Sequence, residues 1–118
     1  MKSIRWFTLF IVAIPILFMG IRGANPADNN TDSDQACNYL SQSLIHIARE
    51  EYNEALTLLE LALDLQKTNP ELYRLAGQVL EMLDRAEEAI TAWQKCYDYA
   101  TEQALRDEAQ LHINNLSP

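Results

Sequence analysis

The chain has 118 residues, enough for one small domain, with 17 acidic and 9 basic residues and a formal net charge of −8. Three of the basic residues fall within the first 22 positions, whereas every acidic residue lies from Asp28 onward. The remainder of the chain is therefore strongly acidic and repels phosphate groups. This excludes nucleic-acid binding as a function and argues against docking of the body on anionic lipid.

Residues 1–23 form a hydrophobic leader with a short basic start. The expected membrane segment is residues 4–21, whose apolar run from Trp6 to Ile21 spans about 24 Å as a helix, against a hydrocarbon core of about 30 Å. This length suits a cleavable secretory signal or a minimal anchor. Because no A-x-A pattern marks a cleavage site, a single-pass anchor is favoured over a secreted product. The basic start predicts that the body is extracytoplasmic, in a periplasm or comparable lumen.

Residues 24–35 (ANPADNNTDSDQ) are expected to form a flexible acidic linker, because they include no large apolar side chain. From Ala36 the composition changes to helix formers, and no alternating β-branched pattern appears. Asn69 and Pro70 together predict a helix start, with Asn as the cap and Pro at the first helical position. We therefore expect an all-α domain over residues 36–118.

A repeat of 34 residues organises this domain. EYNEALTLL, starting at Glu51, recurs without a gap as RAEEAITAW, starting at Arg85, so that Ala55 returns as Ala89. Further matched positions are Leu59 with Trp93 and Ala62 with Cys96. A fixed period of this length indicates stacked copies of one helix pair.

The pattern resembles the tetratricopeptide repeat (TPR) family over repeats 36–69 and 70–103, with residues 104–118 resembling its capping helix. The resemblance implies an α-solenoid of about five helices in antiparallel pairs, following the N-terminal hydrophobic helix. It also implies which residues fill the core of repeat two: Tyr73, Ala76, Gly77, Leu80, Ala89, Trp93 and Cys96.

The first helix of repeat one fits the pattern less well. Aligned without gaps, its core positions hold Tyr39, Gln42, Ser43 and His46, whereas its apolar residues fall one position later: Leu40, Leu44, Ile47 and Ala48. Either the turn before Tyr52 is one residue short and the apolar stripe is core, or the stripe lies on the concave face. The first alternative is favoured, since burial of four apolar side chains stabilises a fold by several kcal/mol.

No residues are arranged for catalysis, cofactor binding or metal binding. His46 and His112 have no cysteine or acid at metal-ligand spacing and are interpreted as partly exposed polar side chains. Cys96 is interpreted as a small core residue that stays apart from Cys37. The paired acids at positions 50–51 and 87–88 point in different directions on a helix and are interpreted as solvated. We expect a protein that is not an enzyme.

The resemblance implies a concave groove lined by the first helix of each repeat. Carried over by position, the groove also includes Cys37, and the predicted partner-binding residues are Leu40, Leu44, Ile47, Arg74, Gln78, Glu81 and Met82. The subgroup that grips acidic C-terminal tails uses Lys and Asn here, but Leu40, Leu44 and Gln78 stand at those positions. A half-apolar groove instead favours an amphipathic helix or extended segment of another protein.

The leading hypothesis is thus a membrane-tethered adaptor or assembly factor for a protein complex. The alternatives are a fixed structural subunit of a membrane complex and a secreted soluble binder. Two repeats and a cap are marginal in stability, because about three repeats are usually needed to cover their hydrophobic faces. We therefore expect a homodimer or completion of the array by a partner.

Overall fold

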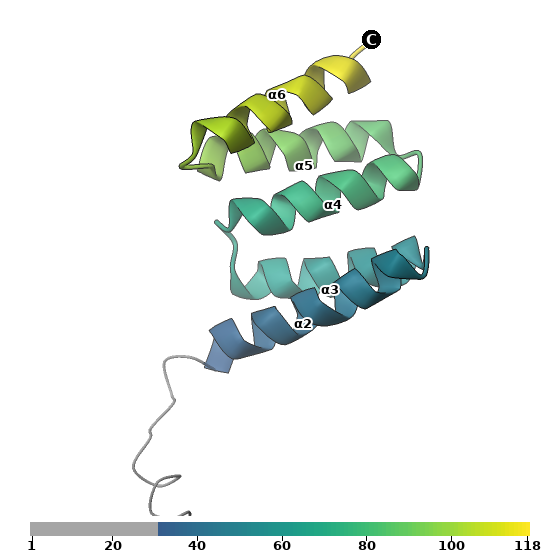
Figure 1. Cartoon of the computed structure of the whole chain (residues 1–118), viewed down its shortest axis with the longest axis vertical. Coiled ribbons are helices and arrows are strands. Elements are labelled where there is room, and N and C mark those ends of the chain that lie inside the picture. The colour runs from purple at the N-terminus through teal and green to yellow at the C-terminus, as the bar shows by residue number, and fades with distance from the viewer. Residues whose placement is uncertain (1–30) are drawn as a thin grey trace, which may run out of the picture. The chain divides into compact units, whose positions relative to one another are not determined.

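The computed structural model describes residues 31–118, which form five α-helices and no strand. The helices are α2 (Thr31–Ala48), α3 (Tyr52–Leu65), α4 (Pro70–Met82), α5 (Ala86–Tyr99) and α6 (Gln103–Leu116). They stack in chain order, each turning back on the one before it (Figure 1). The prediction of an all-α fold is confirmed for these residues. The leader, the predicted anchor and the first part of the predicted linker lie outside the described residues.

The turn inside each helix pair repeats with the same 34-residue period. Glu50 and Asp84 both have a left-handed backbone, with φ of 62° and 60°. The following N–H groups, those of Glu51 and Arg85, each donate to the carbonyl oxygen five residues earlier at 2.9 Å. The two turns are therefore the same structure at equivalent positions, and the chain folds as TPR-like helical repeats.

This identity of the turns shows that the favoured interpretation of repeat one was wrong. No residue is missing before α3, so the alignment without a gap holds. Ser43 is completely buried, whereas Leu44 is 47% exposed and Ala48 is exposed. Leu40 and Ile47 are half-buried against the core. The left-handed turn fixes the face that α2 presents to α3, so the stripe of four apolar side chains does not turn fully into the core.

Gly77 and Ser43 occupy equivalent positions in the two repeats. A Cβ atom on Gly77 would lie 2.8 Å from the Trp93 indole, so only glycine fits there. One repeat earlier, the smaller Leu59 stands at the position of Trp93 and leaves room for a side chain. Ser43 fills that room, and its hydroxyl donates to the Leu40 carbonyl at 2.7 Å. The polar residue is thus satisfied inside the core.

The second helices were predicted correctly. The residues at the matched positions of the repeat are all buried: Ala55, Leu59, Ala62, Ala89, Trp93 and Cys96. In α4, Ala76, Gly77 and Leu80 are buried as expected, while Tyr73 is only half-buried. Asn69 caps α4 by accepting a hydrogen bond from the Glu71 N–H at 3.0 Å, which confirms the predicted helix start.

The predicted linker, residues 24–35, ends too late. Helix α2 begins at Thr31, five residues before the expected boundary at Ala36. Asp32 and Asp34 lie in its first turn, where a carboxylate favours the positive end of the helix dipole. Ala36, only 2% exposed, anchors this turn to the domain. Among residues 31–118, no helix is both long and apolar enough to cross a lipid bilayer.

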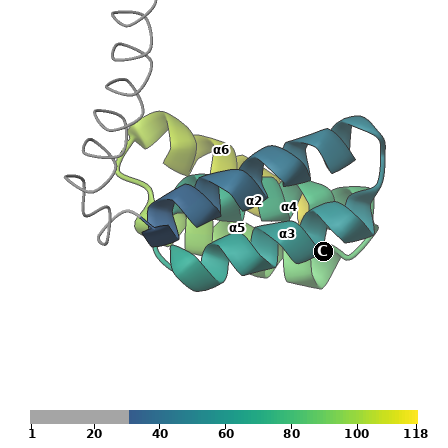
Figure 2. The same cartoon turned by 90° about the horizontal axis from the view of Figure 1, so that it is seen from below.

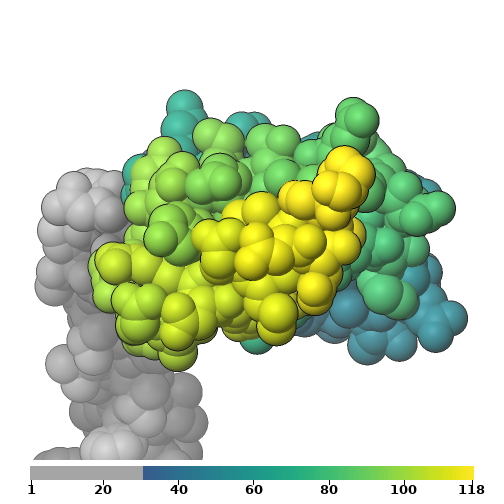
Figure 3. Space-filling view, turned by 90° about the horizontal axis from the view of Figure 1, so that it is seen from above, coloured from purple at the N-terminus to yellow at the C-terminus, as the bar shows by residue number. Residues whose placement is uncertain are grey.

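Helix α6 covers one end of the array (Figure 3). On its inner face, Ala109 is completely buried, and Leu105, His112, Ile113 and Leu116 are half-buried. Its outer face is polar, with hydrogen bonds from Gln103 to Asp107 and from Gln110 to Asn114. Leu111 is the exception, at 58% exposed. A polar outer face of this kind is typical of a capping helix.

Candidate protein-binding groove

A hollow of about 510 Å³ opens between α2 and α4, the first helices of the two repeats. We call it the α2–α4 groove. Its walls come from both helices and from the start of α3: Leu44, Ile47, Tyr52, Leu75, Gln78, Val79, Glu81 and Met82. In Figure 2, which faces the end of the array formed by α2 and α3, α4 lies behind these two helices. The groove is thus an inter-repeat feature with mainly apolar walls.

Five of the seven predicted binding residues meet in this groove, namely Leu44, Ile47, Gln78, Glu81 and Met82. Two do not: Leu40 packs against the core, and Arg74 turns toward α6. The structure therefore brings most of the predicted set together on one surface. That this surface binds a partner stays a prediction.

Sequence reasoning missed three walls of the groove: Tyr52, Leu75 and Val79. A usable signal for two of them was present. Leu75 and Val79 lie three residues before Gln78 and Met82, so all four share one face of α4. Tyr52 is only half-buried, because it stands at the first residue of α3 beside the groove.

Two apolar side chains of the groove are widely exposed. Leu44 is 47% exposed and Met82 is 61% exposed. Burial of apolar surface stabilises a complex by about 25 cal/mol for each Å² removed from water. Exposed apolar side chains that gather around a hollow, rather than scatter singly, are typical of an interaction site.

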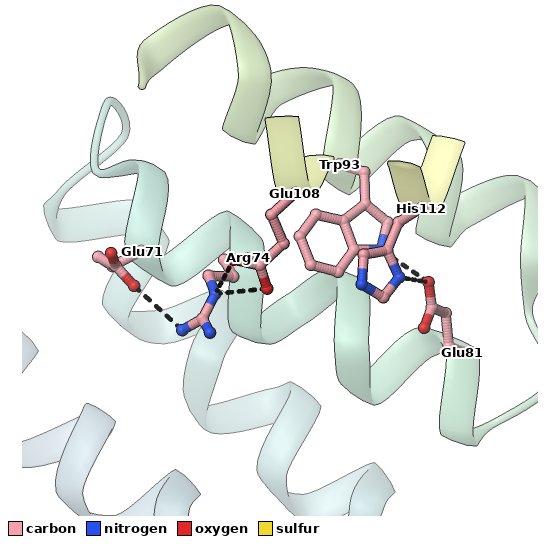
Figure 4. A network of polar contacts seen from close by, with 6 residues as sticks. All are labelled: Glu71, Arg74, Glu81, Trp93, Glu108 and His112. Atoms are coloured by element: carbon pink, nitrogen blue, oxygen red, sulfur yellow. Dashed lines mark hydrogen bonds and ion pairs between the residues drawn. The ribbon is translucent and has the colours of Figure 1, made fainter. Parts of the chain in front are cut away.

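One wall residue, Glu81, is held by a contact between three helices (Figure 4). Its Oε1 atom accepts a hydrogen bond from Trp93 Nε1 at 2.9 Å and lies 2.7 Å from His112 Nδ1. The His112 ring stacks on the Trp93 indole, with centroids 4.1 Å apart and planes 13° apart. His112 is thus part of a packed cluster, which its sequence position did not reveal.

Arg74 also contacts the capping helix, α6. Its Nε donates to both carboxylate oxygens of Glu108 at 3.0 and 3.1 Å, and its Nη1 lies 3.5 Å from Glu71 (Figure 4). The hydrogen bond with Glu108 raises the pKa of the Arg74 guanidinium. The guanidinium therefore joins α4 to α6, away from the α2–α4 groove.

His46 and the two cysteines do not line the α2–α4 groove. His46 Nδ1 lies 2.7 Å from Glu51 across the α2–α3 turn. Cys37 is exposed and Cys96 is buried in the core, where burial raises the pKa of its thiol to about 11. Within residues 31–118, no three His, Cys, Asp or Glu side chains gather as a metal site would require.

The chain is similar to a protein of the fruit fly Drosophila melanogaster named BBSome complex member BBS4 homolog. The two are 43% identical over 61 residues, which cover 52% of this chain and 13% of that protein. The chain thus matches only a small part of its relative's length. No protein-family model matches it.

Proposed function

We propose that this protein is an adaptor without catalytic activity, which holds a segment of another protein in the α2–α4 groove. The observation that carries the proposal is the exposed pair Leu44 and Met82 around a hollow with apolar walls. In the monomer these two apolar side chains are exposed to water. A partner that buries them removes this apolar surface from water. Gln78 and Glu81 add polar groups that orient the bound segment.

The similarity to a protein named as a member of the BBSome complex supports a role inside a multi-protein assembly. It extends over 61 residues and 13% of that protein, so we infer the kind of function and not the identity of the complex. An amphipathic helix or extended segment fits the groove, since its apolar side would cover Leu44 and Met82.

A homodimer is the second candidate for covering apolar surface. Head-to-tail stacking is disfavoured, because the end formed by α6 is lined by hydrogen-bonded polar pairs. The outer side of α2 has a similar pair, in which Gln42 donates to Asn38 at 3.1 Å. Dimerisation would therefore use the groove itself and compete with a partner.

We also propose that residues 4–21 tether the protein to a membrane with its body extracytoplasmic. The hydrophobic leader and its basic start support this proposal. A fixed subunit of a membrane complex and a secreted binder are the alternatives. N-terminal sequencing of the mature protein separates them: an intact leader excludes the secreted form, and a shortened chain excludes the anchor.

The groove is tested by photo-cross-linking in the native source. A photoreactive residue at Met82 is expected to capture a defined peptide of another protein. The same residue at Leu61, which is 41% exposed on α3 and does not line the groove, is the control. Capture that is equal from both positions, or from Leu61 alone, contradicts the proposal.

A further inference from the structure

The α2–α4 groove has an equivalent place one repeat later, between α4 and α6. Adding 34 to the numbers of three residues at the first place gives the cluster at the second: Ile47 corresponds to Glu81, Leu59 to Trp93, and Gln78 to His112. At the second place, the His112 ring lies flat on the Trp93 indole and contacts Glu81 (Figure 4). None of the three residues at the first place carries a ring.

The walls also differ between the two places. Ala109 in α6 is completely buried and lets that helix pack closely. Leu75, at the equivalent position of α4, is larger and lines the groove. Tyr52 stands where the second place has the small Ala86. Larger walls and the lack of an internal ring leave the first place open, while a histidine of the chain itself fills the second.

We propose that the α2–α4 groove accepts an aromatic side chain of the partner, in the role that His112 has at the second place. This inference rests on the proposed function and names the chemistry of its ligand. Tyr52 supplies an aromatic wall for an offset or edge-to-face contact, and Leu44 and Met82 supply the apolar sides. Methionine sulfur also packs well against rings.

A basic residue beside this aromatic side chain completes the recognition. Both contacts of Glu81 use Oε1 and, within residues 31–118, no hydrogen bond is made by Oε2. Glu81 lines the groove, so Oε2 is placed to accept from a lysine or arginine. The strongly acidic body favours the approach of such a segment and disfavours an acidic one.

In the test, small probes are added to the purified full chain. Their binding is monitored through the NMR signals of the Leu44 and Met82 methyl groups. Three probes carry the same indole with different charges: tryptophanamide (cation), N-acetyltryptophanamide (neutral) and N-acetyltryptophan (anion). Leucinamide is the cation without a ring. We expect tryptophanamide to bind roughly three- to tenfold more tightly than leucinamide. Tryptophanamide should also bind at least about twofold more tightly than N-acetyltryptophan at low salt.

Two variants locate the binding site. Gln78→Trp fills the hollow with an internal indole and should abolish the probe shifts. Gln110→Trp places the same indole on the exposed outer face of α6 and should leave them unchanged. Retained binding in Gln78→Trp, equal affinity of leucinamide, or tighter binding of N-acetyltryptophan overturns the inference. So do methyl shifts that depend on protein concentration without probe, which would mean that a second copy fills the groove.

The outcomes separate this inference from the proposed function. If Met82 captures a partner but no indole probe shifts the groove methyl groups, the aromatic recognition is wrong and the adaptor proposal stands. If the probes bind as expected but Met82 captures no partner peptide, the recognition chemistry stands and the adaptor proposal is wrong.

Discussion

Arg74 and Glu108 are one full repeat apart in sequence, and Arg74 Nε donates to both carboxylate oxygens of Glu108 at 3.0 and 3.1 Å. The ion pair joins the first helix of repeat two to the capping helix. Together with the stacking of His112 on Trp93, this ion pair fixes α6 over α5 and closes the place between α4 and α6. The groove at the other inter-repeat place has no such closure.

Loss of this ion pair should have a small effect that depends on salt. Both side chains are about one-third exposed, so we expect Glu108→Gln to lower the free energy of unfolding by about 0.5–1 kcal/mol. Urea unfolding at low and high salt measures the change, which should shrink as salt rises. Glu88→Gln, which removes a more exposed pair with Arg85, is the control and should cost less. Equal costs would show that α6 is not held by Arg74.

Gly77 should not tolerate a methyl group. The Cβ of Gly77→Ala meets the Trp93 indole at 2.8 Å, and the overpacking outweighs the gain in helix propensity, for a net cost of about 1–2 kcal/mol. Thermal and urea unfolding measure it. Trp93→Leu copies the Ser43 and Leu59 pair of repeat one, so Gly77→Ala should cost much less in a Trp93→Leu background. Additive effects of the two substitutions would contradict the equivalence of the repeats.

The two cysteines should differ sharply in reactivity. Burial raises the pKa of Cys96 to about 11 from its ordinary 9.0, so its thiol stays protonated and covered at neutral pH. We expect an alkylating reagent to modify Cys37 in the folded protein and Cys96 only after unfolding. Mass spectrometry of the labelled peptides measures both. Equal labelling rates in the native state would show that the core around Cys96 opens readily.

The same shift predicts a loss of stability at alkaline pH. Because the folded-state pKa of Cys96 is raised, its contribution is complete below about pH 9 and is lost as pH rises toward 11. Relative to the wild type, Cys96→Ala should lack this part of the alkaline loss. The comparison is made as the difference between the two proteins, so that the contributions of their shared groups cancel. A constant difference from pH 8 to 11 would contradict it.

The parts of the fold that follow the 34-residue period could be predicted from sequence. The second helices pair small and large residues, Ala55 with Leu59 and Ala89 with Trp93, and this spacing alone identifies their buried faces. The first helix of repeat one could not be predicted in the same way. Its buried Ser43 is polar and its exposed Leu44 is apolar, so a rule based on hydrophobicity alone selects the wrong face.

For a related reason, only part of the candidate site could be predicted from the sequence. Five groove residues followed from the resemblance to the tetratricopeptide repeat, which implies that the first helix of each repeat lines a groove. The engagement of Glu81 by Trp93 and His112 depends on how α6 lies over α5, which no local pattern specifies. The extra turn at the start of α2 was missed because its residues are polar, although Asp32 and Asp34 suit a helix N-terminus.

The central claim is tested most directly by two neighbouring residues of α2. Leu44 lines the groove and is 47% exposed, whereas Ile45 is 51% exposed and does not line it. The measurement is the affinity of Leu44→Lys and Ile45→Lys for the partner peptide that the photoreactive residue at position 82 captures. We predict at least about tenfold weaker binding for Leu44→Lys, as expected for a buried apolar contact, and a change within about twofold for Ile45→Lys. Equal affinities of the two variants would contradict binding in the α2–α4 groove.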